Sequence, residues 1–247
     1  MIIFKLFRTI ITYILFILLV LVFAIPFIIV MLLPEKWRYD NKFFFWMADK
    51  FYKLSLLVIF VPVEFVGKEN ITKTPSIIAA NHQSSLDIPL VGSLLNGYPH
   101  LWMAWSALRR YWIGPVISRM AVLVDVTSSM KAMKSLLKAV EMFKDKNRHV
   151  IIFPEGARSS GNQVADFFAG FVILAKKTGR PVIPVLLLNA YDAYPPGAFF
   201  INWVPMKVVV GKPVLYADFG SDDEFKNFVR NWFVDNVNEY EMGRVKK

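Results

Sequence analysis

The sequence predicts an α/β protein: a mainly parallel, mixed sheet flanked by helices and preceded by a hydrophobic helical hairpin at the amino terminus. Three observations lead to this prediction. A long uncharged segment opens the chain, short aliphatic runs alternate with helical stretches from Val63 onward, and polar turn-forming residues follow several of those runs. We expect residues 1–62 to form a membrane-associated hairpin and residues 63–247 to form one α/β domain.

The composition of the 247-residue chain favours contact with a membrane. Hydrophobic residues make up 55% and charged residues 19%, against roughly 45–50% and about 25% in ordinary soluble domains, which excludes disorder. The net charge of +10 fits an anionic membrane face or a nucleic acid. The sequence has no recognised nucleic-acid-binding motif, and such a function would not account for the uncharged segment. We therefore expect a lipid bilayer, and no nucleic acid, as partner.

The chain contains no cysteine, which excludes disulfides, thiolate metal sites and a cysteine nucleophile. No pair of histidines or carboxylates has the spacing typical of metal ligands. We therefore expect neither a metal nor a cofactor. Any acyl transfer would then use an oxygen nucleophile.

The uncharged segment from Ile10 to Leu33 contains 24 residues, and a helix of this length measures about 36 Å, enough to cross a hydrocarbon core of about 30 Å. A second segment from Lys42 to Val63 begins with aromatic residues but carries Asp49, Lys50 and Lys53. Each such charge costs about 2.5–3.5 kcal/mol at the bilayer centre, so we expect an interfacial or half-inserted helix. Basic residues flank the first segment on both sides, which leaves open a hairpin in one leaflet or a single crossing.

Seven short apolar runs are predicted as strands: Val63 to Val66, Ser76 to Ala80, His100 to Ala104, Val122 to Val126, Val150 to Phe153, Val182 to Leu187 and Met206 to Val210. Two helices are predicted over Ser128 to Lys146 and Asp222 to Tyr240. In the first helix we expect one stripe to face the core, made of Met130, Met133, Leu137 and Val140.

His82 lies in a polar turn directly after the run Ser76 to Ala80, at the carboxyl end of a strand, where open α/β sheets place their ligand sites. Asp87 follows five residues later, and a helix beginning near Ser84 or Ser85 would bring its carboxylate back toward the imidazole. A carboxylate on one ring nitrogen orients the ring and stabilises the imidazolium. The sequence therefore predicts His82 as a general base oriented by Asp87.

Ser84 and Ser85 are also candidates for a covalent nucleophile beside His82. Neither lies in a Gly-x-Ser-x-Gly elbow, so we expect them to cap the following helix. The other two histidines, His100 and His149, flank strands, and we expect structural or surface roles for them.

A second polar turn, Phe153-Pro154-Glu155-Gly156-Ala157-Arg158-Ser159, follows the apolar run from His149 to Phe153. Its proline and glycine turn the backbone outward and leave Glu155 and Arg158 near the sheet edge. Free N–H groups and the planar guanidinium of Arg158 suit an anion such as phosphate. Taken alone, this loop is also typical of a solvated surface turn with an ion pair.

Together the two loops resemble the motifs of the glycerolipid acyltransferase family, specifically the 1-acyl-glycerol-3-phosphate (lysophosphatidic acid) acyltransferases. The stretch from Asn81 to Asp87 is similar to the NHxSxxD motif of that family. The second turn is similar to its FPEGTRS motif, with Ala157 in place of threonine, and the stretch from Arg180 to Val185 is similar to its fourth block. The resemblance covers about residues 60 to 215, and bacterial members also carry amino-terminal hydrophobic helices.

The resemblance implies transfer of a fatty acyl group from acyl-CoA or acyl-carrier protein to the free hydroxyl of a lysophospholipid. The expected acceptor is 1-acyl-glycerol-3-phosphate, which would give phosphatidic acid. His82, held by Asp87, would remove the hydroxyl proton, with the catalytic domain on the cytoplasmic face of the membrane. The substrate-binding residues that the resemblance implies are Asn81, Ser84, Glu155, Gly156 and Arg158.

Several cationic positions of the family pattern differ in this chain. Trp105 stands where a basic residue is usual, Val126 stands where an arginine is usual, and Phe167-Phe168-Ala169-Gly170 lacks the usual lysine. Arg109 and Arg110 are candidates to replace the missing charge. An acyltransferase for a different lysolipid or lipid alcohol is therefore one alternative. An inactive membrane-anchored lipid-binding or interaction protein is a second.

Two groups of aromatic residues suit an anionic lipid surface, with packing in the core as the alternative. Tyr111 and Trp112 adjoin a pair of arginines, and a Pro/Gly-rich loop contains Phe199, Phe200 and Trp203.

Overall fold

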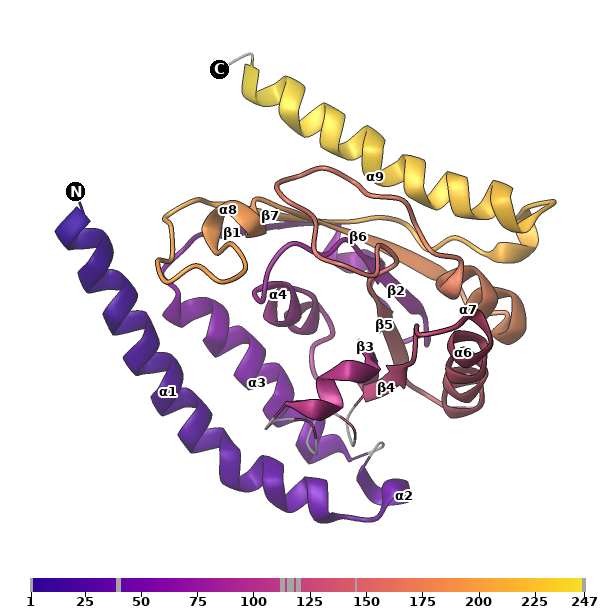
Figure 1. Cartoon of the computed structure of the whole chain (residues 1–247), viewed down its shortest axis with the longest axis horizontal. Coiled ribbons are helices and arrows are strands. Elements are labelled where there is room, and N and C mark those ends of the chain that lie inside the picture. Colours follow the sequence, from indigo (N-terminus) through magenta and orange to yellow (C-terminus); the bar gives the residue numbers. More distant parts are fainter. Residues whose placement is uncertain are drawn as a thin grey trace.

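The computed structural model describes residues 2–38, 41–111, 114, 118, 121–144 and 146–245. Its first three helices are α1 (Ile2–Leu32), the short α2 (Glu35–Arg38) and α3 (Lys42–Val58). Helices α1 and α3 run antiparallel side by side (Figure 1). The ring of Phe51 in α3 lies 5.6 Å from Phe23 and 5.8 Å from Phe27 of α1, measured between centroids. The structure thus confirms the predicted amino-terminal hairpin.

Among the described helices, α1 is long and apolar enough to cross a membrane by length and composition, and most of it is exposed. Helix α3 lies between α1 and the rest of the chain and packs against α4 (Asp87–Leu94) (Figure 1). Asp49 of α3 is buried, and its carboxylate lies 2.8 Å from the Lys53 ammonium. Helix α3 precedes residue 62 and α4 follows it, and the two share a packed interface. The division of the chain into two domains at residue 62 therefore stays a prediction.

The sheet contains seven strands: β1 (Val63–Val66), β2 (Ile77–Ala80), β3 (His100–Trp105), β4 (Ala121–Val124), β5 (His149–Ile152), β6 (Val182–Leu188) and β7 (Met206–Val210). Their order is β1-β7-β6-β2-β5-β3-β4, and all neighbours are parallel except β6 and β7. The predicted mainly parallel, mixed sheet is therefore confirmed.

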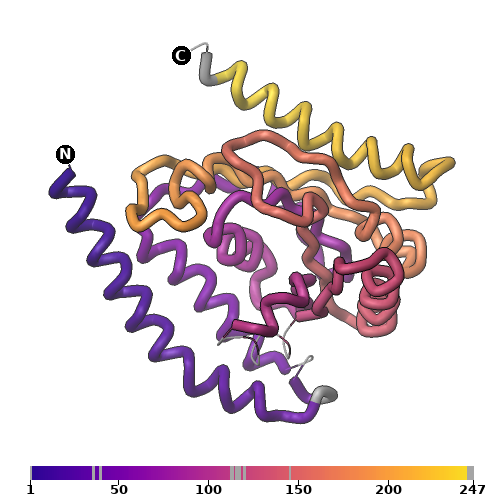
Figure 2. The backbone as a smooth tube through the Cα atoms, in the orientation of Figure 1, coloured from indigo at the N-terminus to yellow at the C-terminus, as the bar shows by residue number. Residues whose placement is uncertain are grey.

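Helices cover both faces of this sheet. On one face, α6 (Ser129–Phe143), α7 (Gly170–Thr178) and α9 (Asp222–Val245) bury large side chains such as Phe143, Phe171 and Phe233. On the other face lie α4, α8 (Ala190–Ala193) and the end of α3. The short 3₁₀ helices are η1 (Lys68–Asn70), η2 (Ser106–Arg110) and η3 (Tyr216–Asp218). Figure 2 shows the two longest helices, α1 in indigo and α9 in yellow, along different sides of the rest of the chain.

The core stripe predicted for α6 is wrong for three of its four residues. Met130 is 80% exposed, Met133 41% and Leu137 40%, and of that stripe only Val140 is buried. The helix instead faces the core with Leu136, Ala139, Val140 and Phe143. This difference has a physical cause: α6 packs beside β4, the last strand of the sheet, and against α7 on one flank, so the methionine side of the helix is left uncovered.

His100 and His149 lie side by side at the amino-terminal ends of β3 and β5, where both are buried. The His100 Nδ1–H donates to the Tyr98 carbonyl at 2.8 Å, and its Nε2 lies 3.2 Å from the Tyr52 hydroxyl. The His149 Nδ1 accepts the Ser76 N–H at 3.1 Å. Burial lowers the pKa of each imidazole to about 4, so both are neutral structural residues near pH 7.

We expect the free energy of unfolding to fall as the pH is lowered from 6.5, the ordinary imidazole pKa, to about 4. In this range the unfolded chain protonates both histidines while the folded protein keeps them neutral, so acid favours the unfolded state. Each histidine contributes a slope of at most about 1.4 kcal/mol per pH unit. Urea unfolding in detergent at several pH values measures this slope. The double variant His100→Gln, His149→Gln should show a flatter dependence, and an unchanged slope in that variant would contradict the assignment.

Candidate active site

The first candidate loop, residues 81–87, begins where β2 ends, and Asn81 fixes this point. Its side-chain Nδ2 donates to the Leu187 carbonyl of β6 at 2.9 Å, and its Oδ1 accepts the Leu187 N–H at 2.7 Å. The side chain is fully buried. Asn81 therefore shapes the loop, and its part in substrate binding stays a prediction.

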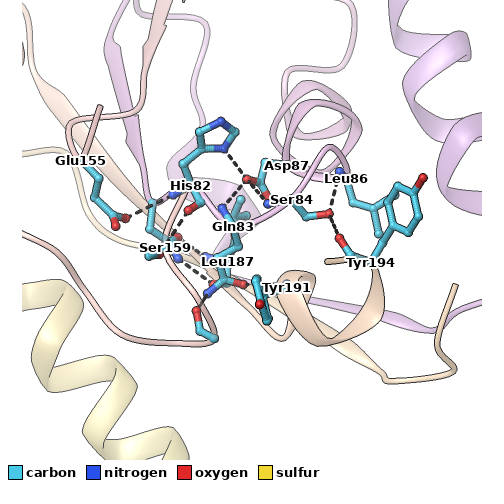
Figure 3. Close-up of polar contacts among 12 residues, drawn as sticks. His82, Gln83, Ser84, Leu86, Asp87, Glu155, Ser159, Leu187, Tyr191 and Tyr194 are labelled. Carbon is cyan, nitrogen blue, oxygen red and sulfur yellow. Dashed lines mark hydrogen bonds and ion pairs between the residues drawn. The ribbon is translucent and has the colours of Figure 1, made fainter. Parts of the chain in front are cut away.

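His82 and Asp87 form a directly bonded pair, as the sequence predicts (Figure 3). The His82 Nδ1 lies 2.6 Å from Asp87 Oδ2, which also accepts the backbone N–H groups of Gln83 at 2.6 Å and Ser84 at 2.9 Å. Asp87 is fully buried in the first turn of α4, where the helix dipole favours a negative charge. Three donors on one carboxylate oxygen require the proton of the imidazole to sit on Nδ1.

The other ring nitrogen of His82 is available to a substrate. The ring stacks on Phe153 with 4.2 Å between centroids and 15° between planes, and the side chain is 18% exposed. Figure 3 shows Nε2 pointing away from Asp87, and no described residue forms a hydrogen bond with it. With the proton on Nδ1, Nε2 carries the lone pair that a general base needs.

The second candidate loop, residues 153–159, forms hydrogen bonds with both the N–H and the carbonyl group of His82. Glu155 Oε1 accepts the His82 N–H at 3.2 Å, and Glu155 Oε2 accepts the Ala165 N–H at 3.4 Å. The Ser159 N–H donates to the His82 carbonyl at 2.8 Å. Glu155 is buried, and burial raises the pKa of its carboxyl group above the ordinary value. Its observed role is therefore to hold the two loops together, and its part in substrate binding stays a prediction.

Ser84 is buried and has a structural role as well. Its Oγ–H donates to the Tyr194 carbonyl at 2.6 Å, and its Oγ accepts the Leu86 N–H at 3.3 Å. Residue Leu86 occupies the N-cap position of α4, and no side chain caps it. The predicted serine cap is therefore wrong, because Ser84 binds a distant loop, while Ser85 is exposed. The part of Ser84 in substrate binding likewise stays a prediction.

Gly156 and Arg158 are the predicted substrate-binding residues that remain on the surface. Gly156 has a φ of 70°, and a Cβ there would lie 2.8 Å from the Phe168 ring. Arg158 is exposed and has no hydrogen bond or ion pair with the described residues. Its guanidinium is therefore the cation of this loop that is free to bind an anion.

A polar network that the sequence analysis missed ties the first loop to α9. The Gln83 Nε2 donates to the Gly161 carbonyl at 2.7 Å and to Asn162 Oδ1 at 3.3 Å. Asn162 donates in turn to Glu241 of α9 at 2.8 Å, and its Oδ1 accepts the Asn189 N–H at 2.9 Å. Only the position of Gln83 beside His82 could have drawn attention to this network, because its other members lie far along the chain.

The neighbouring edge of the sheet is apolar where the family pattern has cations. Trp105, at the end of β3, is 56% exposed, and Val126, just beyond β4, is 61% exposed. Arg109 and Arg110 are exposed in η2, whereas Trp112 lies outside the described residues. Among the described residues, no group of three or more His, Asp or Glu side chains could hold a metal ion.

Comparison with known proteins identifies the family of this chain. An acyltransferase family model matches residues 62–188, which is just over half of the chain. The chain therefore belongs to the acyltransferase family.

One relative is the 1-acyl-sn-glycerol-3-phosphate acyltransferase of Saccharomyces cerevisiae, 30% identical over 202 residues that cover 78% of this chain and 66% of the yeast protein. The enzyme of the same name from Limnanthes alba is 28% identical over 189 residues, which cover 72% of this chain and 64% of the plant protein. The chain thus spans slightly less than two thirds of these curated relatives. The crystal structure of the LPA acyltransferase PlsC from Thermotoga maritima superposes with a TM-score of 0.75 at 26% identity, covering 96% of this chain and 97% of that one.

We expect Gly156→Ala to lower the free energy of unfolding by about 1–3 kcal/mol, because alanine disfavours a positive φ and its Cβ would press on the Phe168 ring. Gly161→Ala is the matched control, since Gly161 has a φ of 67° and nothing within 4 Å of its Cβ position. The loss in Gly156→Ala should therefore exceed the loss in Gly161→Ala when both are measured by chemical denaturation. Equal losses would show that Phe168 exerts no constraint on the loop.

Proposed function

We propose that this protein transfers a fatty acyl group from a thioester, acyl-CoA or acyl-carrier protein, to the free hydroxyl of 1-acyl-sn-glycerol-3-phosphate. The observation that carries the proposal is the 2.6 Å bond between His82 and Asp87, with Nε2 of His82 left open. The names of the curated relatives support the acceptor.

In the proposed reaction, His82 Nε2 takes the hydroxyl proton as the acceptor oxygen attacks the thioester carbonyl. Asp87 stabilises the resulting imidazolium. The tetrahedral intermediate then collapses, the new ester forms, and the departing thiolate takes the proton back from His82. General-base assistance of this kind contributes about 10²–10⁴-fold. The steps use only side chains of this protein and the two substrates.

We assign the phosphate of the acceptor to Arg158. Glu155 holds this loop to the backbone of His82, and Arg158 lies three positions after Glu155. The Arg158 guanidinium is therefore on the loop adjacent to the base. A planar guanidinium can bind two phosphate oxygens at once.

One observation favours a second acceptor. Trp105 and Val126 present apolar surface where further cations would strengthen the binding of a phosphomonoester. A lysophospholipid with a larger head group would place less negative charge there.

We further propose that the enzyme works at a membrane surface, with its catalytic domain on the cytoplasmic face. The apolar exposed side of α1 supports this arrangement. The loop that carries Phe199 and Trp203, 53% and 60% exposed, lies against the same helix and would face the lipid head groups.

We expect His82→Ala and Asp87→Asn each to lower the rate of acyl transfer at least about 100-fold. The first variant removes the base, and the second removes the carboxylate that holds the imidazole proton on Nδ1. The assay follows a labelled acyl chain from acyl-CoA or acyl-carrier protein to lysophosphatidic acid in vesicles. Association with the vesicles should persist in both variants. Ser85→Ala is the control and should keep the parent rate, since this exposed serine has no proposed role. Equal rates in His82→Ala and the parent protein would eliminate His82 as the base.

We expect the parent protein to prefer lysophosphatidic acid over lysophospholipids with larger head groups, and Arg158→Ala to raise the KM for lysophosphatidic acid about 10- to 100-fold, the value of one charge-assisted hydrogen bond. Lys177→Ala, an exposed charge at the end of α7, is the control and should leave KM unchanged. Preference for a larger head group would replace the proposed acceptor with the second one.

A further inference from the structure

One side of α1 is polar and faces the domain, although the helix as a whole is apolar. Arg8, Thr9 and Thr12 are buried. The Arg8 Nη2 donates to the Ile201 carbonyl at 2.6 Å, and the Ile201 N–H donates to Thr9 Oγ1 at 3.3 Å. These bonds attach the first turns of α1 to residues 190–201, which we call the bridging segment.

Arg8 is a costly residue to bury in this way. Its Nε and Nη1 have no hydrogen-bond partner among the described residues. Burial of an incompletely paired charge adds little to stability. What Arg8 does define is the rotation of α1 about its own axis, because only one side of the helix can reach Ile201.

Tyr13 continues this polar side of α1 toward the active site. Its hydroxyl donates to the Phe199 carbonyl at 2.8 Å and lies 3.1 Å from the Tyr194 hydroxyl. A phenol has one proton, which Tyr13 gives to the carbonyl, so the Tyr194 hydroxyl must donate to Tyr13. Tyr194 and Phe199 of the bridging segment therefore meet at a single hydroxyl of α1.

The bridging segment also touches the two residues that hold Asp87 (Figure 3). The Tyr194 carbonyl accepts the Ser84 Oγ–H at 2.6 Å, and the Tyr191 N–H donates to Gln83 Oε1 at 3.3 Å. The backbone N–H groups of Gln83 and Ser84 are the donors that fix Asp87 Oδ2 beside His82. Hydrogen bonds thus connect α1 to the catalytic pair through Tyr194 and Ser84, each of which makes one bond with its side chain and the next with its backbone.

We propose that α1 is a positioning element of the active site, and that Tyr13, acting through Tyr194 and Ser84, sets the geometry of Asp87 and His82. The inference rests on the proposed function, because it concerns the same base. Misplacement of a catalytic group by about 1 Å can cost 10²-fold in rate, so a lost bond in this set affects turnover. Movement of α1 in the bilayer then changes the rate of the chemical step as well as the attachment of the enzyme.

The test compares Tyr13→Phe and Tyr194→Phe, which both remove the bond between the two hydroxyls and keep both rings. Tyr13→Phe also removes the bond to the Phe199 carbonyl. We expect each variant, in the full chain in vesicles, to lower kcat about 3- to 10-fold, with KM, melting temperature and vesicle association unchanged. Tyr98→Phe is the matched control, since its hydroxyl donates to Asn147 beside the amino-terminal ends of β3 and β5. The double variant should lose no more than the worse single variant. Losses that multiply, or an unchanged kcat, would overturn the proposal.

A second measurement does not depend on activity. Diethyl pyrocarbonate modifies accessible neutral imidazoles, and His82 is accessible whereas His100 and His149 are buried. The rate of modification of His82 should change at least about 2-fold in Tyr13→Phe and Tyr194→Phe, and not in Tyr98→Phe. If the parent protein transfers no acyl group, the proposed function fails, while this rate still tests the coupling. Unchanged modification in both variants overturns the coupling and leaves the proposed function standing.

Discussion

The arrangement of the site depends on one carboxylate oxygen, Asp87 Oδ2, which accepts hydrogen bonds from an imidazole and two backbone amides. Asp87 has no solvent contact, and electrostatic interactions are stronger in such surroundings than in water. The neighbouring elements hold this group in place. Asn81, directly after β2, is hydrogen-bonded to β6, and Glu155 accepts the backbone N–H of His82. Gln83 connects the same loop to the polar network that reaches α9.

Two segments about 70 residues apart form the site because β2 and β5 are parallel neighbours in the sheet, with Ile77 opposite Val150. Their carboxyl ends meet at one edge, so the loops after them lie in contact. Because this placement follows from the topology, it does not depend on the apolar Trp105 at the end of β3 or on Val126 just beyond β4. In the proposed function these two residues bear on the choice of acceptor, and the pairing of His82 with Asp87 does not involve them.

Much of the fold could be predicted because it is encoded locally. Strands β1 and β7 have the predicted bounds, since β-branched runs between turn residues are a local signal, and the pairing of His82 with Asp87 spans only five residues. The roles of Asn81, Ser84 and Glu155 could not be predicted, because their partners, Leu187, Tyr194 and Ala165, are set by tertiary packing. The same limit applies to α6, where the exposure of Met130 depends on which elements stand beside it, and to the short α7 and α8, whose sequences carry little helical periodicity.

The stacking of His82 on Phe153 has a consequence for selectivity between water and lipid alcohols. An aromatic ring 4.2 Å away covers one face of the imidazole, so water cannot reach the base across that face. The approach to Nε2 is narrower as a result. In the proposed reaction, an acceptor hydroxyl bound at Nε2 takes the place of the water that the base would otherwise activate.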